Sequence, residues 1–439
     1  MNKEEFQFKN KKILIYGFGI SGKACFKHLN RNNHTFIYDD NLKLTNNKYK
    51  KRILNREKIS QYNFNYIVIS PGIDLKKCLL KNYLKKNKKK IISELDVFYL
   101  ENKNNLKITI TGTNGKSTTS KLLYEIIKNH KRDVRLVGNI GNPILLEKKV
   151  NPKTIFVIEA SSYQIEYSKY FKTDIAAILN ISPDHLERHG NIKKYVQSKF
   201  KLIKNQKKGS LSFIEKKSKY LDLEIKKNKI KSKIIKISTL FPKLLKKKIK
   251  NNYFNNQNNI NNLKFILEIS KKLKLNKKII IKTVNSFKGL KYRQQIIFNN
   301  KKLQIINDSK STSFASSINL IQSYKNIYWL VGGKYKKGDK FILDKKYYNN
   351  IRGYIYGSKN NFFQNQFKNK IKYKIFNNIK KALLKIIEDS KNDNLSKKII
   401  LFSPSAASFD QFKNFEERGK YFNSQIKNIK FIKKINGRK

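Results

Sequence analysis

Residues 106–121 read LKITITGTNGKSTTSK and combine a strand pattern, a glycine turn and a helical pattern. Residues 107–111 (KITIT) are rich in β-branched side chains, which is typical of a buried strand. Gly112–Ser117 follows, and Thr118–Asn129 then has a helical pattern. Strand, glycine turn and helix together predict a phosphate site. Glycines let backbone N–H groups turn toward an anion, and a helix N-terminus adds its positive dipole end.

Two side chains of this turn carry specific expectations. Lys116 is expected to reach the β- and γ-phosphates of a nucleotide, and Ser117 to place its hydroxyl on Mg²⁺. The other residues expected around the phosphates are Gly112, Thr113, Asn114, Gly115 and Thr118. The general phosphate-loop pattern is only partly met, because Ile110 stands where a further glycine is usual. A tight strand-to-helix turn with a surface lysine is the alternative.

Composition allows a large globular protein. The chain has 439 residues, of which 39% are hydrophobic, which is enough for two to four domains. Its formal net charge is +68. Such a charge indicates either nucleic-acid binding or the lysine and asparagine bias of an AT-rich genome. Because the lysines are spread over the whole chain, we favour the bias, and we expect no specific nucleic-acid partner.

Targeting signals are not evident. No run of about 18 apolar residues occurs, so we expect no membrane span. The first residues, MNKEEFQFKNKK, lack the apolar core of a signal peptide, which predicts a cytoplasmic protein. The two cysteines, Cys25 and Cys78, form neither a metal cluster nor a disulfide framework.

Residues 11–94 read as a first α/β module. Ile13–Tyr16 is a predicted strand, residues 17–22 (GFGISG) open a helix, and Thr35–Tyr38 is a second strand that ends at Asp39. This βαβ unit is typical of nucleotide-phosphate sites, and NAD and a UDP-type ligand are equally open. A purely structural turn between strand and helix is the alternative. Pro71 and Gly72 follow a third predicted strand, and residues 76–90 are expected to form a basic helix.

A second module surrounds the phosphate loop. Residues 154–159 (TIFVIE) are a predicted buried strand ending in Glu159, a carboxylate that suits Mg²⁺ beside a phosphate loop. Residues 175–180 (IAAILN) form the next strand, and His185 follows it. An amphipathic helix is expected over residues 263–275.

In the C-terminal part, four predicted strands (residues 303–307, 327–331, 354–356 and 398–402) each end in small or polar residues. Their loops should converge on one edge of a doubly wound sheet. We therefore predict an α/β protein of three domains. A Rossmann-like domain spans residues 1–94, a P-loop ATPase domain with a mostly parallel sheet spans 95–288, and a second Rossmann-like domain spans 289–439.

In this order the motifs resemble the Mur ligase family along essentially the whole chain. TGTNGKST is similar to the family's ATP loop, residues 308–312 (DSKST) to a DSKAT loop, and residues 403–419 (SPSAASFDQFKNFEERG) to an SPxxASxDxFxxFxxRG signature. The resemblance implies a monomeric ligase of peptidoglycan precursor synthesis without a membrane partner. ATP phosphorylates the carboxylate of UDP-N-acetylmuramoyl-L-alanine, and the amine of D-glutamate then attacks the acyl phosphate.

The resemblance also implies a role for particular residues. Lys116 and three residues at metal sites, Glu159, His185 and Lys199, would be catalytic. Ser117 and Glu159 would hold one Mg²⁺ and His185 a second, and Lys199 matches a lysine that the family carbamylates with CO₂. Further contacts to ATP are implied for Asn259, Asn262, Arg293 and Asp308. Contacts to the UDP-sugar are implied for Ile20, Ser21, Asp39, Gly72 and Asn139. Contacts to D-glutamate are implied for Lys310, Thr312, Lys336, Ser408 and Phe415.

Three other functions stay open from the sequence. A basic P-loop ATPase acting on nucleic acid should carry aromatic stacking platforms in a basic groove, which the sequence does not reveal. Another amide ligase, such as a folylpolyglutamate synthase, would lack the first module. A dehydrogenase built on the first glycine turn would bind NAD.

Overall fold

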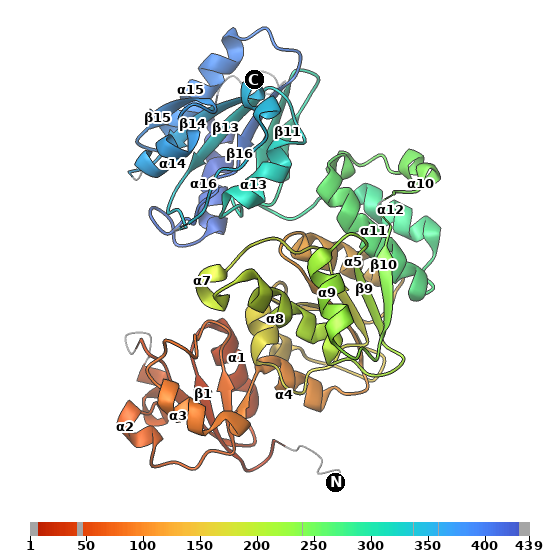
Figure 1. Ribbon diagram of the computed structural model, residues 1–439, viewed down its shortest axis with the longest axis vertical. Coiled ribbons are helices and arrows are strands. Elements are labelled where there is room, and N and C mark those ends of the chain that lie inside the picture. Colours follow the sequence, from red (N-terminus) through yellow and green to blue (C-terminus); the bar gives the residue numbers. More distant parts are fainter. Residues whose placement is uncertain (1–7, 42–46, 239, 337, 359, 430–439) are drawn as a thin grey trace. The chain divides into compact units, whose positions relative to one another are not determined.

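A computed structural model describes residues 8–41, 47–238, 240–336, 338–358 and 360–429 (Figure 1). The chain divides into two compact units, residues 1–249 with 261–285 and residues 250–260 with 286–439. The first seven residues, on which the signal-peptide expectation partly rests, lie outside the described part. Among the described residues, no helix combines the length and the hydropathy needed to cross a lipid bilayer.

The first sheet is parallel throughout. Its strands are β1 (Lys12–Tyr16), β2 (His34–Tyr38), β3 (Tyr66–Ile69) and β4 (Ile91–Ile92), in the order β2-β1-β3-β4. Its helices are α1 (Ile20–Leu29), α2 (Arg56–Ile59) and α3 (Lys81–Lys86), with 3₁₀ turns at η2 (Asn47–Arg52) and η3 (Lys88–Lys90). Since β2 and β3 flank β1 on opposite sides, the carboxyl end of β1 lies at a topological switch point, where ligands bind in open α/β sheets.

The expected basic helix over residues 76–90 is wrong in extent, because only Lys81–Lys86 is α-helical. Leu84 is the one buried residue of that helix, and Cys78 and Leu80 are buried in the turns before it. The three lysines after the helix form the 3₁₀ turn η3, which has no buried residue. The side chain of Asn87 donates to the Tyr83 carbonyl (3.0 Å) and closes the last turn.

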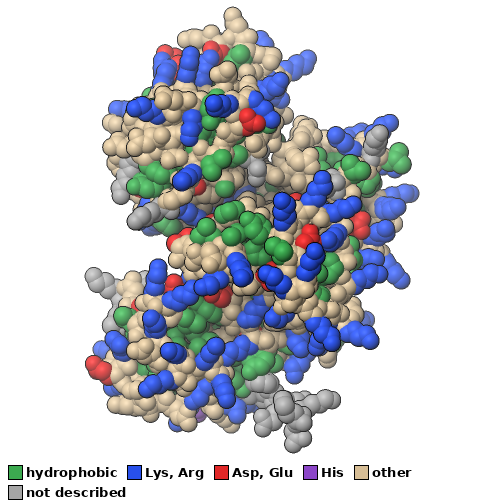
Figure 2. Space-filling model, viewed as in Figure 1, with side chains coloured by type: hydrophobic (Ala, Val, Ile, Leu, Met, Phe, Trp, Pro, Cys, Tyr) green, Lys and Arg blue, Asp and Glu red, His purple; other side chains and the backbone are tan. Residues whose placement is uncertain are grey.

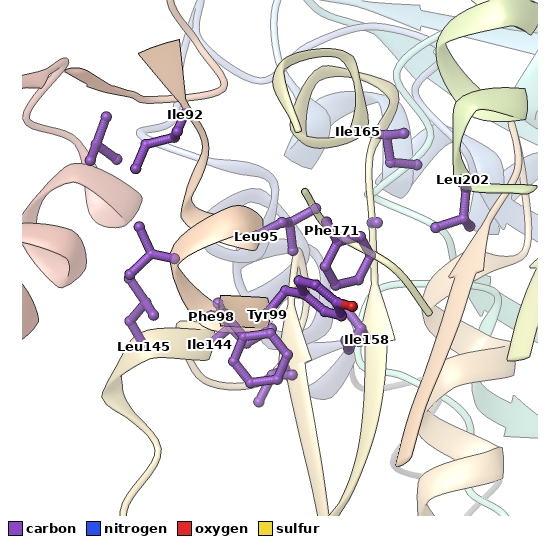
Figure 3. Close-up of a cluster of buried hydrophobic side chains, with 14 of the residues drawn as sticks. Ile92, Leu95, Phe98, Tyr99, Ile144, Leu145, Ile158, Ile165, Phe171 and Leu202 are labelled. Atoms are coloured by element: carbon purple, nitrogen blue, oxygen red, sulfur yellow. The ribbon is translucent and has the colours of Figure 1, made fainter. Parts of the chain in front are cut away.

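Helix α4 (Glu94–Glu101) follows the first sheet, and hydrogen bonds of Ser93 and Asp96 fix its first turn. Ser93 and Asp96 form a capping box, and Asp96 also accepts the backbone N–H groups of residues 169–171 (2.7–3.0 Å). Figure 3 shows the apolar side chains of this helix beside Phe171 and Ile158. The same apolar cluster includes side chains of the first and second sheets, which explains why the two sheets belong to one compact unit.

The second sheet is also parallel, in the order β10-β9-β8-β5-β7-β6. Its strands are β5 (Leu106–Thr111), β6 (Val134–Gly138), β7 (Ile155–Glu159), β8 (Ile175–Ile178), β9 (Leu211–Glu215) and β10 (Lys233–Ile237). The α-helices around it are α5 (Lys116–Asn129), α6 (Ser162–Tyr167), α7 (Leu186–His189), α8 (Ile192–Lys204), α9 (Lys219–Lys227) and α10 (Lys243–Lys248). A 3₁₀ turn, η4 (Ile144–Leu146), follows β6. The central strand β5 is buried from Lys107 to Thr111, and it leads into the glycine turn at the carboxyl edge.

Helix α11 (Gln257–Lys272) begins earlier than the expected residue 263, and α12 (Lys277–Ser286) follows it. The first residues of α11 are polar, so the sequence does not show the amphipathic pattern of a helix there. Asn259 and Asn262 are both buried there, so amide side chains occupy positions where an amphipathic helix would carry apolar ones. The 3₁₀ turn η5 (Asn252–Phe254) precedes this helix.

The third sheet has the order β11-β12-β16-β13-β14-β15, and only β11 runs antiparallel. Its strands are β11 (Gln295–Asn299), β12 (Leu303–Asn307), β13 (Ile327–Gly332), β14 (Ile351–Tyr356), β15 (Lys372–Phe376) and β16 (Lys398–Phe402). Its helices are α13 (Phe314–Ile321), α14 (Asn360–Phe367), α15 (Ile379–Asn392) and α16 (Phe415–Asn428), with a 3₁₀ turn at η6 (Lys345–Asn350).

The two edge strands of this sheet, β11 and β15, were not expected from the sequence. Neither contains a buried side chain, and an edge strand without a buried face lacks the hydrophobic alternation that identifies strands in a sequence. The expected α/β class with mostly parallel sheets is confirmed. The domain boundaries after residues 94 and 288 lie between successive sheets and stay a prediction.

The first glycine turn offers a matched pair of stability variants. A Cβ on Gly22 would lie 1.9 Å from the Gly17 carbonyl oxygen, whereas a Cβ on Gly19 would meet no atom within 4 Å. Gly22→Ala should therefore destabilise the fold by about 1–3 kcal/mol through overpacking. In differential scanning calorimetry, the temperature of the first unfolding transition should be lower for Gly22→Ala and nearly unchanged for Gly19→Ala. Equal transition temperatures for the two variants would contradict the described turn.

Candidate active site

The glycine turn between β5 and α5 has the backbone of a phosphate loop. Gly112 (φ 147°) and Gly115 (φ 84°) both adopt positive φ values, which other residues rarely reach. A Cβ on Gly115 would lie 2.2 Å from Oδ1 of Asn262, so the α11 side chain approaches the loop closely. The Nζ of Lys116 folds back on the loop and donates to the carbonyls of Gly112 (2.9 Å) and Thr113 (2.8 Å).

Asn180, which follows β8, holds this loop through hydrogen bonds. The Asn180 carbonyl accepts the Thr113 N–H (3.0 Å), and its Oδ1 accepts the Asn114 N–H (2.8 Å). The Thr113 hydroxyl lies 3.0 Å from the Tyr195 hydroxyl and accepts the Ser182 N–H (3.0 Å). The sequence reasoning gave Asn180 no role, because its position next to the loop follows only from the pairing of β5 with β8.

Lys199 of α8 reaches the same loop from the other side. Its Nζ donates to the Gly112 carbonyl (2.9 Å) and lies 4.8 Å from the centre of the Tyr195 ring. Burial, followed by the nearby charge of Lys116, lowers the pKa of the Lys199 ammonium well below its ordinary value. The structure therefore brings two lysines to the carbonyls of one turn, and one of them is fully buried.

Two oxygen atoms beside the loop lack hydrogen-bond partners. They are Oγ of Ser117 and Oε2 of Glu159, both buried. The other carboxylate oxygen of Glu159 accepts from Nδ2 of Asn139 (2.9 Å). Buried polar atoms normally have partners, and a hydroxyl and a carboxylate are oxygen ligands that Mg²⁺ accepts. These residues fit a magnesium ion, although no group of three or more His, Cys, Asp or Glu side chains with metal-site geometry occurs among the described residues.

His185 occupies a different environment from Glu159 and Lys199. It adopts a left-handed backbone conformation (φ 53°) at the start of α7, and its side chain is 36% exposed. Its Nε2 lies 3.4 Å from Asp184 and its ring packs against Tyr163. The nearby His189 is buried against the Ser162 hydroxyl (3.0 Å), and burial lowers its pKa to about 4. Of these two histidines, only His185 therefore faces solvent.

Of the residues expected to hold a UDP-sugar, all but Asn139, which follows β6 of the second sheet, lie at the carboxyl edge of the first sheet. Asp39 accepts the Phe18 N–H (2.6 Å), while Ile20 is 81% exposed at the start of α1. Gly72 is also exposed, in the turn after β3. The Ser21 hydroxyl interacts with Glu94, whose pKa is raised by burial to about 7. Glu94 was not singled out by the sequence, since its burial depends on how α4 packs.

Asp308 lies at the end of β12 in the second compact unit. Its carboxylate accepts the Gln294 N–H (3.1 Å) and the Ser403 hydroxyl (2.9 Å). Burial raises its pKa to about 7, although these hydrogen bonds and the charges of Arg293 and Arg418 oppose the increase. Arg293, which is also expected to contact ATP, thus lies near enough to Asp308 to influence its pKa.

Asn259 and Asp308 both form a hydrogen bond with Gln294. Its Nδ2 donates to the Tyr253 carbonyl (2.7 Å) and to Oε1 of Gln294 (3.2 Å). Gln294 has a left-handed backbone (φ 47°), and its N–H donates to Asp308. Asn259 therefore supports the strained segment next to Arg293.

The residues expected around D-glutamate are distributed over three loops of the third sheet. Nζ of Lys310 lies 3.9 Å from the centre of the Phe415 ring, and Ser408 is buried after β16. Thr312 and Lys336 are half-buried. The backbones of Lys334 and Ala407 pair with each other (2.9 and 3.0 Å), which joins the loop after β13 to the loop after β16.

Arg418 links these loops, and the sequence reasoning gave it no role. Its side chain is completely buried and donates to the Ser309 hydroxyl (3.1 Å), the Ser309 carbonyl (2.7 Å) and the Ala406 carbonyl (2.9 Å). The arginine of the FxxRG motif was the available signal. Two of its three partners, however, are carbonyl groups, and no sequence pattern identifies which carbonyls a side chain will meet.

Comparison with known proteins places the chain among similar sequences and folds. Residues 110–283 match the Mur ligase middle domain. Relatives named UDP-N-acetylmuramoylalanine–D-glutamate ligase are 33% identical in Rickettsia bellii (94% of this chain, 97% of the relative), and 32% identical in Francisella philomiragia (97% and 99%).

Solved structures share the fold at lower identity. MurF ligase from Thermotoga maritima in complex with ADP has a TM-score of 0.54 at 13% identity, covering 95% of this chain and 96% of that one. UDP-N-acetylmuramate-alanine ligase MurC from Thermotoga maritima has a TM-score of 0.53 at 15% identity, covering 95% and 99%.

The raised pKa of Asp308 predicts a pH-dependent stability difference. The folded protein holds this proton up to about pH 7, whereas the unfolded chain loses it near pH 4, roughly the ordinary value. The stabilisation is complete below about pH 4 and is lost as the pH rises through 7. Asp308→Asn, which does not titrate, should therefore raise the melting temperature relative to the parent protein more at pH 8 than at pH 5.

Paired thermal melts at the two pH values measure this difference. Asp222→Asn is the control, because Asp222 forms a partly exposed ion pair with Lys236 on the other unit. A constant offset between Asp308→Asn and the parent protein at both pH values would show that the Asp308 carboxylate is not buried as described.

Proposed function

The chain belongs to the Mur ligase family, and we propose that it is an ATP-dependent ligase that joins D-glutamate to UDP-N-acetylmuramoyl-L-alanine. The observation that carries this proposal is its similarity to relatives of that name over 94% of this chain and 97% of the Rickettsia bellii protein. The loop at Gly112–Ser117 and the converging loops of the third sheet support it. The reaction would belong to the synthesis of peptidoglycan precursors in the cytoplasm.

In the proposed reaction, a carboxylate and ATP, both anions, react first, and the amide bond forms in a second step. A carboxylate oxygen of the UDP-sugar substrate attacks the γ-phosphorus of ATP, giving an acyl phosphate and ADP. The amine of D-glutamate then attacks the acyl carbon, phosphate leaves, and the nitrogen loses a proton. Phosphoryl transfer of this kind depends on positioning and on positive charge near the transferred group.

Lys116 is the cation proposed to act on the transferred phosphoryl group. Its Nζ now rests on the carbonyls of Gly112 and Thr113, at the loop itself. A phosphate in the loop would offer stronger, charge-assisted hydrogen bonds than these carbonyls. We expect Asn262 to contact the nucleotide from α11, because its amide already meets Gly115.

The orphaned oxygens of Ser117 and Glu159 are proposed to hold a magnesium ion, and the half-exposed His185 a second. Bound magnesium would neutralise phosphate charge and polarise the phosphoryl oxygens. Asn139 holds Glu159 in place through Oε1, which leaves Oε2 for the ion. Asn139 is also proposed to contact the muramoyl part of the substrate.

Lys199 is proposed to carry a carbamate. A neutral amine attacks CO₂, forms an N–C bond and releases one proton, which converts a lysine into an anion that can bind a metal. The amine donates to the Gly112 carbonyl and is fully buried. The nearby Lys116 would stabilise the anion, whereas it disfavours the ammonium.

The remaining site residues are proposed to bind the three substrates. ATP would be contacted by Gly112–Thr118, Asn259, Asn262, Arg293 and Asp308. The UDP-sugar would be contacted by Ile20, Ser21, Asp39, Gly72 and Asn139. D-glutamate would be contacted by Lys310, Thr312, Lys336, Ser408 and Phe415.

We propose a monomer whose domains span residues 1–94, 95–288 and 289–439. Figure 2 shows the basic side chains scattered over the visible face and not gathered in one stripe, which supports a reaction partner other than nucleic acid. Stacking platforms beside a basic groove would have favoured nucleic-acid binding.

Release of inorganic phosphate tests the function directly. With ATP, Mg²⁺ and UDP-N-acetylmuramoyl-L-alanine, we expect phosphate release with D-glutamate, and little with L-glutamate, L-lysine or meso-diaminopimelate. Lys116→Ala should lower kcat at least about a thousandfold, because the transition-state charge loses its fixed cation. Lys121→Ala is the control, since this α5 lysine pairs with Glu125 (3.3 Å).

Two results would overturn the proposal. Phosphate release that depends on another amino acid would change the substrate, and a near-normal kcat in Lys116→Ala would remove the proposed role of the loop.

Chemical rescue tests the carbamate at Lys199. Lys199→Ala should lose activity, and acetate or propionate should restore part of it by supplying a carboxylate where the carbamate would lie. The exposed Lys204 of the same helix supplies the control Lys204→Ala, which should need no rescue. Recovery with ethylamine instead would mean that a cation, and not a carbamate, is needed there.

A further inference from the structure

A connected set of buried serine hydroxyls lies beneath the loops of the third sheet. Ser317 of α13 is at its centre, with its Oγ 2.6 Å from Ser311, 2.7 Å from Ser403 and 2.6 Å from Ser405. Ser317 and Ser405 are both completely buried. One side chain on a helix thus joins the loop after β12 to the loop after β16.

The hydrogen bonds of this set have a defined direction when Asp308 is ionised. A carboxylate only accepts, so the Ser403 hydroxyl uses its one proton on Oδ2 of Asp308 (2.9 Å). Ser317 must then donate to Ser403, which leaves Ser317 to accept from Ser311 and Ser405. A hydroxyl has one proton and two lone pairs, so the three short contacts use the full capacity of Ser317.

Ser405 needs such support because of its backbone. It has a φ of 55°, in the left-handed region, where a residue with a Cβ is strained by about 1–2 kcal/mol. The bond to Ser317 fixes its side chain, and the indole N–H of Trp329 donates to the neighbouring Ser403 carbonyl (2.7 Å). The left-handed turn at Ser405 leads directly into Ala406, Ala407 and Ser408.

We propose that Ser317 is a positioning residue, whose buried hydroxyl holds the loop at residues 403–408 in its strained conformation and orients Ser403 toward Asp308. Through this loop it sets the position of Ser408, so it acts on amino-acid binding without touching the amino acid. The inference relies on the proposed function only for the identity of that substrate, D-glutamate.

The experiment compares Ser317→Ala with Ser390→Ala. Ser390 is also buried in this unit, but its hydroxyl donates only to the Ile387 carbonyl of its own helix (2.9 Å). We expect Ser317→Ala to raise the KM for D-glutamate about tenfold, because the loss of one buried hydrogen bond has about this effect on an equilibrium. The KM for the UDP-sugar substrate should stay unchanged, and Ser390→Ala should resemble the parent enzyme. Ser317→Cys, which nearly keeps the volume but donates weakly, should act like Ser317→Ala and serves if the alanine variant does not fold.

The double variant Ser317→Ala/Ser405→Gly separates positioning from general destabilisation. Glycine adopts positive φ without strain, so the loop should regain its conformation and the KM for D-glutamate should fall back toward the parent value. Glycine relieves backbone strain only in this loop, so a rise in the KM for D-glutamate that arises elsewhere in the third sheet would not be repaired by it. No recovery in the double variant, an unchanged KM in Ser317→Ala, or an equal rise in Ser390→Ala would each overturn the proposal.

Hydrogen exchange gives a readout that needs no ligase activity. Ser317→Ala should increase amide exchange in residues 403–412 while the rest of the third sheet keeps its protection. Exchange that rises over the whole unit, or nowhere, contradicts the positioning role. If the parent protein fails to use D-glutamate, the proposed function fails, whereas the exchange result still decides the role of Ser317.

Discussion

The hydrogen bonds between parallel strands are the interaction on which the rest of this structure depends. In each of the three sheets they align strand ends along one edge, so loops that are distant in the sequence become neighbours. In the second sheet, β5 lies between β7 and β8 and brings the turn at Gly112 next to Glu159 and Asn180. The same arrangement around β12 and β16 places Asp308 beside Ser403.

At these edges the fold retains polar groups that a core would exclude. The buried amine of Lys199 donates to a backbone carbonyl. Oε2 of Glu159 and Oγ of Ser117 lack hydrogen-bond partners, and burial raises the pKa of Asp308. Each of these arrangements costs stability, because buried charges and unpaired polar atoms lose their hydration. Their concentration at the strand ends is what distinguishes a ligand-binding edge from a packed one. The apolar clusters of the same sheets compensate for this cost.

Some polar groups at the edges hold loops and do not await a ligand. Arg418 donates to the carbonyls of Ser309 and Ala406, and Ser317 connects three other serines. Both side chains are fully buried and use most of their hydrogen-bonding capacity within the protein. Preorganised loops of this kind lower the entropic cost of binding, since a ligand then has fewer side chains to order.

The sequence by itself determined the α/β class, the parallel core strands and the position of the glycine turn between β5 and α5. These depend on local patterns, namely β-branched runs, glycine turns and helical periodicity. Only the tertiary structure decided that β11 and β15 complete the third sheet, that Glu94 and Lys199 are buried, and that Arg418 and Ser317 join separate loops. The physical reason is that burial and hydrogen-bond partnership belong to pairs of residues brought together by folding. Ser317 and Ser405 are 88 residues apart, and no local pattern specifies their contact.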